Sequence, residues 1–191
     1  IRREGKVWYQ KYERGQAVSE LKESGTTERT GTKIRFRPDH TIFEVTEFSY
    51  DTLAHRIREL AFLNKGLVFA LADERTGKNQ EFYYKGGIIA FVDELNRNKK
   101  PLHPEPIYVT GEKDDIIVEV ALQYNDGYSE TIYSYANNIN NVEGGTHLTG
   151  FRGALTRTVN KYAEDKGLVK NAKVSLSGDD AREGLTAVIS V

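Results

Sequence analysis

The chain has 191 residues, of which 38% are hydrophobic and 29% are charged, and it contains no cysteine. This length suits one large domain or two small ones with a real core, and the composition excludes a disordered chain. The formal net charge of −1 excludes a field that would draw the whole chain onto nucleic acid or membrane, and the absence of cysteine excludes disulfides, thiolate zinc sites and cysteine catalysis.

The first third of the sequence is rich in predicted strands. Residues 7–12 follow a turn at residues 4–6, which predicts the second arm of a hairpin. Residues 32–37 alternate apolar and basic side chains, which predicts a half-buried strand that Pro38 ends. The first and the last residues both read as interrupted strands, so we expect a piece of a longer protein.

A helix and a hairpin are predicted next. Residues 50–63 place Leu53, Ile57, Leu60 and Ala61 on one face at helical spacing. Strands at 67–72 and 80–84 follow, joined by a short polar loop. The Lys-Gly-Gly sequence at residues 85–87 is the best candidate domain boundary.

The second half is predicted to mix strands and helices without strict alternation. A short amphipathic helix near residues 88–95 precedes a proline-rich loop, and strands at 116–124 and 131–139 are predicted to form an antiparallel pair. A long helix at 146–166 ends before Gly167, and a last strand begins near Leu185. Its predicted buried stripe comprises Leu148, Phe151, Leu155, Val159 and Tyr162. These patterns favour an α+β fold in two parts.

The residues alone give no complete catalytic site. Four scattered histidines show no metal-ligand spacing: His40, His55, His103 and His147. Gly144 and Gly145 before the long helix either bring backbone N–H groups to an anion or only permit a turn before a Thr146 cap, and the turn is favoured. Residues 178–184 read either as a carboxylate pair for a metal or, preferably, as a turn in which Arg182 pairs with an acidic neighbour.

The long helix and the residues after it are locally basic. Residues 150–173 hold six Lys or Arg residues against two acidic ones. Such a surface suits contact with phosphate, although charge runs are more often solvated faces.

Several strings, in this order, resemble the B subunits of the bacterial DNA gyrases. They are RIRELAFLN at 56–64, YKGGI at 84–88, EVALQYNDG at 119–127, NNI at 137–139, GGTHLTGFR at 144–152 and residues 178–191. The resemblance covers nearly the whole chain. It implies that residues 1–86 are the C-terminal portion of a GHKL ATPase α/β sandwich. Residues 87–191 would be a transducer domain with a ribosomal S5 domain 2-like fold, without its lysine loop and last helix.

The resemblance also implies site residues. Gly31 and Thr32 match a segment beside the adenine of ATP, and Ile34 matches an apolar wall of the same pocket. Arg3 matches an arginine at the pocket mouth on which aminocoumarin inhibitors stack. Arg152 matches an arginine that faces a cavity for captured DNA. The resemblance implies no catalytic and no metal-binding residue in this chain, so we expect the chain by itself to be inactive toward ATP.

The implied activity is that of an ATP-dependent type IIA topoisomerase in the cytoplasm. ATP and Mg²⁺ are the cofactors expected for the intact protein. The expected partners are the A subunit of DNA gyrase, a second B subunit, double-stranded DNA and aminocoumarins, with no membrane. Two alternatives stay open: the corresponding subunit of topoisomerase IV, because Tyr124 stands where gyrases commonly have tryptophan, and a non-catalytic S5-like module that binds nucleic acid.

Overall fold

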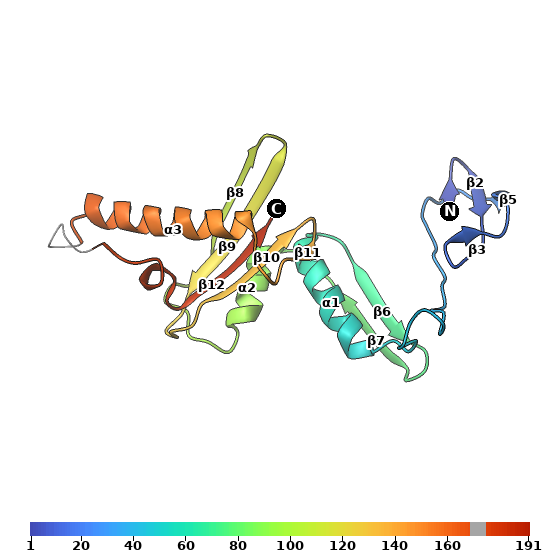
Figure 1. Ribbon diagram of the computed structural model, residues 1–191, viewed down its shortest axis with the longest axis horizontal. Helices are drawn as coiled ribbons and strands as arrows, with labels where there is room; N and C mark the ends of the chain where they lie inside the picture. The colour runs from blue at the N-terminus through green and yellow to red at the C-terminus, as the bar shows by residue number, and fades with distance from the viewer. Residues whose placement is uncertain (169–174) are drawn as a thin grey trace. The chain divides into compact units, whose positions relative to one another are not determined.

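The structure is a computed structural model that describes residues 1–168 and 175–191. The chain forms two compact units, Ile1–Ser49 and Tyr50–Val191, and most of their elements are labelled in Figure 1. The candidate boundary at residues 85–87 lies inside the second unit, between strand β7 and helix α2.

The first unit consists of short strands. β1, β2 and β5 form an antiparallel sheet in that order, and β3 and β4 form a separate hairpin. Their bounds are β1 (Arg2–Arg3), β2 (Lys6–Tyr9), β3 (Tyr12–Glu13), β4 (Gln16–Ala17) and β5 (Lys22–Thr26). Between β1 and β2, Glu4 and Gly5 have φ values of 54° and 76°, the left-handed pair that a two-residue hairpin turn requires. The predicted first hairpin is therefore confirmed.

The predicted strand at residues 32–37 is wrong. Residues 32–39 adopt no regular secondary structure, and only Gly31 makes an isolated bridge, to Arg2. Alternating side chains do not suffice for a strand, because its backbone N–H and C=O groups need a neighbouring strand. Ile34 and Phe36 are 80% and 70% exposed, and the unit has no fully buried residue.

The second unit begins with the predicted helix α1 (Tyr50–Leu63). Its apolar face packs on the hairpin of β6 (Phe69–Asp73) and β7 (Lys78–Phe82), where Ala54, Ala61 and Phe82 form a buried cluster. Both strands begin and end within two residues of their predicted bounds.

A five-stranded sheet forms the centre of the second unit. Its spatial order is β11-β10-β12-β9-β8. The bounds are β8 (Ile107–Lys113), β9 (Ile116–Tyr124), β10 (Thr131–Ala136), β11 (Ile139–Asn140) and β12 (Leu185–Ser190). β8, which sequence patterns did not predict, pairs antiparallel with β9 along its whole length and forms the edge of the sheet.

The predicted pairing of β9 with β10 is wrong, because β12 lies between them. β12 runs antiparallel to β9 and parallel to β10. Residues Leu185 to Ile189 are at most 1% exposed. A strand that is buried on both faces belongs in the middle of a sheet, and this explains why β12 separates the two strands.

Helices α2 (Ile88–Asn96) and α3 (Thr146–Asp165) cover opposite faces of the sheet. Val188 of β12 packs in the α2 cluster, whereas Leu185 and Ala187 pack in the cluster that Phe151 and Leu155 of α3 cover. Adjacent residues of a strand point to opposite faces of the sheet. The α2 cluster and the cluster beneath α3 therefore lie on opposite sides of β12.

The predicted buried stripe of α3 needs one correction. Tyr162 is 58% exposed, and Ala163, one position on, is buried in its place. The α3 residues that pack against the sheet cluster, Phe151 and Leu155, lie further toward the start of the helix. No helix in the described ranges is long and apolar enough to cross a membrane.

Candidate functional site

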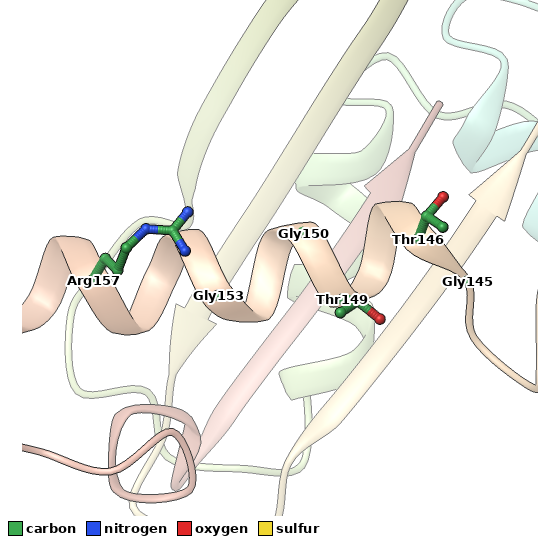
Figure 2. Close-up of a pocket in the computed structure, with 6 residues that line it drawn as sticks. All are labelled: Gly145, Thr146, Thr149, Gly150, Gly153 and Arg157. Carbon is green, nitrogen blue, oxygen red and sulfur yellow. The ribbon is translucent and has the colours of Figure 1, made fainter.

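Helix α3 carries a stripe of small residues beside an open cavity. The stripe repeats every three or four positions, which keeps its members on one face of the helix. The small residues and Arg157 line a cavity of about 560 Å³ (Figure 2). The small residues are Gly145, Thr146, Thr149, Gly150 and Gly153.

The first turn of α3 brings polar groups to this cavity. Gly145 is the N-cap and supplies no side-chain hydrogen bond, so the expectation of a Thr146 cap is wrong. The backbone of Gly145 is fully extended, so the helical conformation begins at the next residue, Thr146. The first N–H groups of a helix have no partner within it, and the partial positive charge of this end favours anions.

Arg157 lies at the other end of the cavity. A Cβ atom at position 153 would lie 3.2 Å from a terminal nitrogen of Arg157, so glycine leaves room for the guanidinium above the helix. No carboxylate of the described residues lies within ion-pair distance of Arg157. Its charge is therefore available to an anion that enters the cavity.

Arg152 is in a different electrostatic setting. It donates a hydrogen bond to Glu130, which also accepts one from Nε of Arg182 at 2.5 Å. Burial raises the pKa of Glu130, but the hydrogen bonds from the two arginines outweigh burial and hold it below the ordinary value of 4.5. Arg182 also pairs with Asp179 at 2.8 Å, which confirms the predicted acidic neighbour. The charge of Arg152 is thus compensated within the protein.

The candidate nucleotide-pocket residues lie in the first unit. Gly31 exchanges two backbone hydrogen bonds with Arg2, at 2.7 and 3.0 Å. Arg3 follows Arg2 in the same strand. Its Nε lies 3.3 Å from Oε1 of Glu4, and its side chain is 77% exposed. Thr32 and Ile34 are exposed in the irregular segment. The structure thus brings Gly31 beside the Arg2–Arg3 strand.

These residues fit at most one wall of a nucleotide site. A ligand pocket encloses most of its ligand, and exposed side chains in one extended segment do not. Within residues 1–168 and 175–191, no three histidines or acidic residues are grouped as possible ligands of a metal ion.

Sequence patterns missed Glu130 entirely. Its arginine partners lie 22 and 52 residues away along the chain, and no local spacing indicates such a cluster. The small-residue stripe of α3 was detectable in principle, because Gly145, Thr149 and Gly153 recur at the helical spacing of four.

Comparison with known proteins places this chain in a family. A family model described as DNA gyrase B matches residues 87–191. The B subunit of the DNA gyrase of Halalkalibacterium halodurans is 56% identical over 193 aligned residues, which cover 100% of this chain and 30% of that protein.

Solved structures agree in fold. The 43K ATPase domain of Thermus thermophilus gyrase B, solved with an aminocoumarin, is 37% identical with a TM-score of 0.83, and the match covers 98% of this chain and 52% of that one. The ATP-binding domain of Francisella tularensis topoisomerase IV, solved with a small-molecule inhibitor, has a TM-score of 0.81. This match covers 100% of this chain and 52% of the topoisomerase IV chain. At 23% identity it shows only that the two proteins share a fold.

The fold is that of the ATPase region of a bacterial type II topoisomerase, and the predicted α+β class is confirmed. The chain belongs to the DNA gyrase B family, which confirms the resemblance seen in its motifs. It spans about a third of the length of the Halalkalibacterium relative.

Proposed function

We propose that this chain is part of the ATP-operated gate of a DNA gyrase, which couples ATP binding and hydrolysis to DNA strand passage and negative supercoiling. The observation that carries the proposal is the 56% identity, along the entire chain, to the gyrase B protein of Halalkalibacterium. We further propose that residues 1–86 belong to the ATPase domain and residues 87–191 to the transducer. The start of the family match at residue 87 supports this division.

The proposed nucleotide site uses Gly31, Thr32 and Ile34, with Arg3 at its mouth as the contact for aminocoumarins. A planar guanidinium suits stacking on a flat ring system. The 77% exposed Arg3 side chain and the exposed Thr32 are accessible for such contacts. ATP and Mg²⁺ are the proposed cofactors of the intact protein, to whose nucleotide site this segment contributes one wall.

The proposed contact with captured DNA lies on α3. Arg152 is retained as a candidate, but its pairing with Glu130 reduces the charge that it presents to phosphate. Arg157, which has no described acidic partner, carries the larger share of the proposed attraction. The remaining proposed partners are the A subunit of DNA gyrase and a second B subunit, and the proposed location is the cytoplasm.

A chimeric gyrase tests the proposal. This chain replaces the matching segment of the Halalkalibacterium gyrase B protein, and the product is combined with the gyrase A protein of that organism and relaxed plasmid DNA. We expect ATP-dependent negative supercoiling. A folded chimera that decatenates linked circles without supercoiling would assign the chain to topoisomerase IV. A chimera that hydrolyses ATP but leaves DNA topology unchanged would contradict the proposal.

A further inference from the structure

A buried carboxylate lies on α1 where this helix faces the sheet. Glu59 is 7% exposed. One of its oxygens accepts a hydrogen bond from Arg56 at 2.7 Å, and the other lies 3.5 Å from Nε2 of His55. A buried carboxylate is costly unless a charged partner compensates it, and the partner here is Arg56, whose own side chain is 40% exposed. The contact therefore also holds the Arg56 guanidinium in a fixed orientation.

The second terminal nitrogen of Arg56 extends the contact to the sheet. It donates a hydrogen bond of 2.6 Å to the backbone carbonyl of Asn138, 82 residues further along the chain. Asn138 lies in the turn between β10 and β11, where Asn137 and Asn138 both have left-handed backbone conformations, with φ of 47° and 65°. One planar guanidinium thus joins the buried carboxylate to a backbone turn.

A second link joins the same two elements. The side-chain amide of Asn138 donates to Oδ1 of Asn64 at 3.2 Å, and the amide of Asn64 donates to the carbonyl of Leu60 at 2.8 Å. Arg56, Glu59, Asn64 and Asn138 are named here the α1–turn cluster. It holds both the middle and the end of α1 against one turn of the sheet.

Tyr135 makes the surroundings of the cluster unusual. Its side chain is fully buried, and its hydroxyl has no hydrogen-bond partner among the described residues. Burial raises the pKa of Tyr135, and the nearby Glu59 carboxylate raises it further. The hydroxyl therefore stays neutral, and it lies near enough to the Glu59 carboxylate to interact with it.

Apolar packing also joins α1 to the rest of the unit, but it is less directional. Phe62 stacks on Phe91 of α2, with ring centroids 4.7 Å apart and planes at 5°. Stacked rings tolerate a range of offsets and centroid distances, whereas hydrogen bonds to a charged group depend on distance and angle. The polar contacts are therefore the ones that fix α1 to a particular position on the turn.

We propose that Arg56, oriented by Glu59, is a positioning residue that makes α1 and the β10–β11 turn move as one body. The inference rests on the proposed function, because α1 lies in the segment assigned to the ATPase domain and the turn lies in the proposed transducer. The α1–turn cluster then transmits displacement between the two.

Hydrogen exchange on the 191-residue chain tests the positioning role. The reporters are the amides of Asn137, bonded to the carbonyl of Val191, and Asn141, bonded to the carbonyl of Ser134. Arg56→Ala is expected to speed their exchange by about tenfold or more, the change expected for losing a hydrogen bond to a charged group. The amides of β12 are expected to keep their rates, because opening is local.

Three further variants sharpen the test. Arg56→Lys keeps the charge but lacks the planar fork, so it is expected to resemble Arg56→Ala. Glu59→Gln is expected to act in the same direction without removing Arg56. Arg97→Ala breaks an exposed pair with Glu94 at the same i,i+3 spacing on α2 and is the matched control, with no expected change at the turn.

The exchange result decides the positioning role. Turn amides that keep their rates in both Arg56→Ala and Glu59→Gln would overturn it. An equal acceleration in β12 would overturn it too, because the cluster would then only add global stability. Should Arg56→Ala fail to fold, Glu59→Gln and Arg56→Lys supply the same comparison.

The coupling role is measured in the chimeric gyrase. Arg56→Lys is expected to keep ATP turnover within about twofold while lowering the supercoils introduced per ATP by about fivefold, a coupling change in the usual range. A parallel fall of both activities would overturn the coupling role. If the unmodified chimera does not supercoil DNA, the proposed function fails, and the exchange data still decide whether α1 and the turn move together.

Discussion

Gly184 keeps two backbone segments in contact because it has no side chain. Its φ is +70°, and a Cβ atom there would lie 2.4 Å from the carbonyl oxygen of Asn125 and 2.8 Å from that of Gly127. Its own carbonyl oxygen accepts hydrogen bonds from the backbone and the side-chain amide of Asn125, at 2.9 and 2.8 Å. Backbone atoms cannot move aside as a flexible side chain would.

Gly184→Ala is therefore expected to destabilise the second unit by about 3 kcal/mol or more, since it combines overpacking with backbone strain. Gly167→Ala is the control, because position 167 shares the left-handed backbone, at φ +61°, but no atom of the described residues lies within 4 Å of the added methyl group. It should cost about 1 kcal/mol. Urea unfolding measures both, and equal losses would contradict the steric explanation.

Glu130 should make stability depend on pH. Its folded pKa lies below the ordinary 4.5, so its contribution is complete above that value and is lost as the pH falls through the folded pKa. Glu130→Gln is expected to lose about 1–3 kcal/mol at pH 7, the range for hydrogen bonds to charged groups. The difference from the unmodified chain should shrink between pH 5 and pH 3 in denaturant unfolding. A difference that stays constant over that range would exclude the carboxylate charge as its cause.

At the scale of elements, local patterns predicted the helices best. The bounds of α1 were predicted to the residue, and α3 to within one residue of its end, because helical periodicity and stop signals are local. The bounds of β9 and the start of β12 were also predicted correctly, because the apolar patterns of strands are equally local. Periodicity says nothing about partners, so the pairing of β9 with β12 rather than β10 could not be predicted.

The sites show the same limit. Arg182 and Asp179 are three residues apart, and their pairing could be predicted. The meeting of Arg152 with Glu130, and of Arg56 with Asn138, depends on contacts across 22 and 82 residues. The roles of Gly31, Thr32, Ile34 and Arg3 came from resemblance rather than from any spacing, and they stay predictions.

Helix α3 offers a direct comparison of two arginines. Arg157→Ala is expected to weaken binding of duplex DNA to the chain and to reduce the magnitude of its salt dependence by about one unit of log–log slope, the share of one phosphate contact. Arg152→Ala is expected to change the slope less and the stability more, because Glu130 would lose a partner. Fluorescence anisotropy at several salt concentrations measures both slopes, and equal slopes for the two variants would contradict this division.

The two compact units differ in how much they bury. The first unit has no fully buried residue, whereas the second contains three buried apolar clusters. A chain segment with little burial gains little to offset its conformational entropy. Each unit should therefore have its own stability in the isolated chain.

Hydrogen exchange followed by peptide mapping should show this difference. Amides in residues 1–49 are expected to exchange within minutes, and those of β9 and β12 to stay protected for far longer, near the limit of global unfolding. A single cooperative unfolding transition should then report the second unit alone. Comparable protection of both units would show that the first unit is more stable than its burial indicates.

The isolated chain is also expected to leave ATP intact. The candidate nucleotide residues are exposed in one extended segment, which cannot enclose a nucleotide by itself. A phosphate-release assay should match the background rate with and without Mg²⁺. Turnover well above background would show that this chain holds more of the active site than we propose.

The central position of β12 has a consequence for synthesis on the ribosome. β8, β9, β10 and β11 all precede β12 in the sequence, yet β12 is the strand that joins β9 to β10. Until residues 185–190 leave the exit tunnel, the two halves of the sheet have no shared strand, and each exposes an unpaired edge. The nascent chain thus passes through a stage at which slow translation favours aggregation. A chaperone that shields strand edges is most useful at this stage.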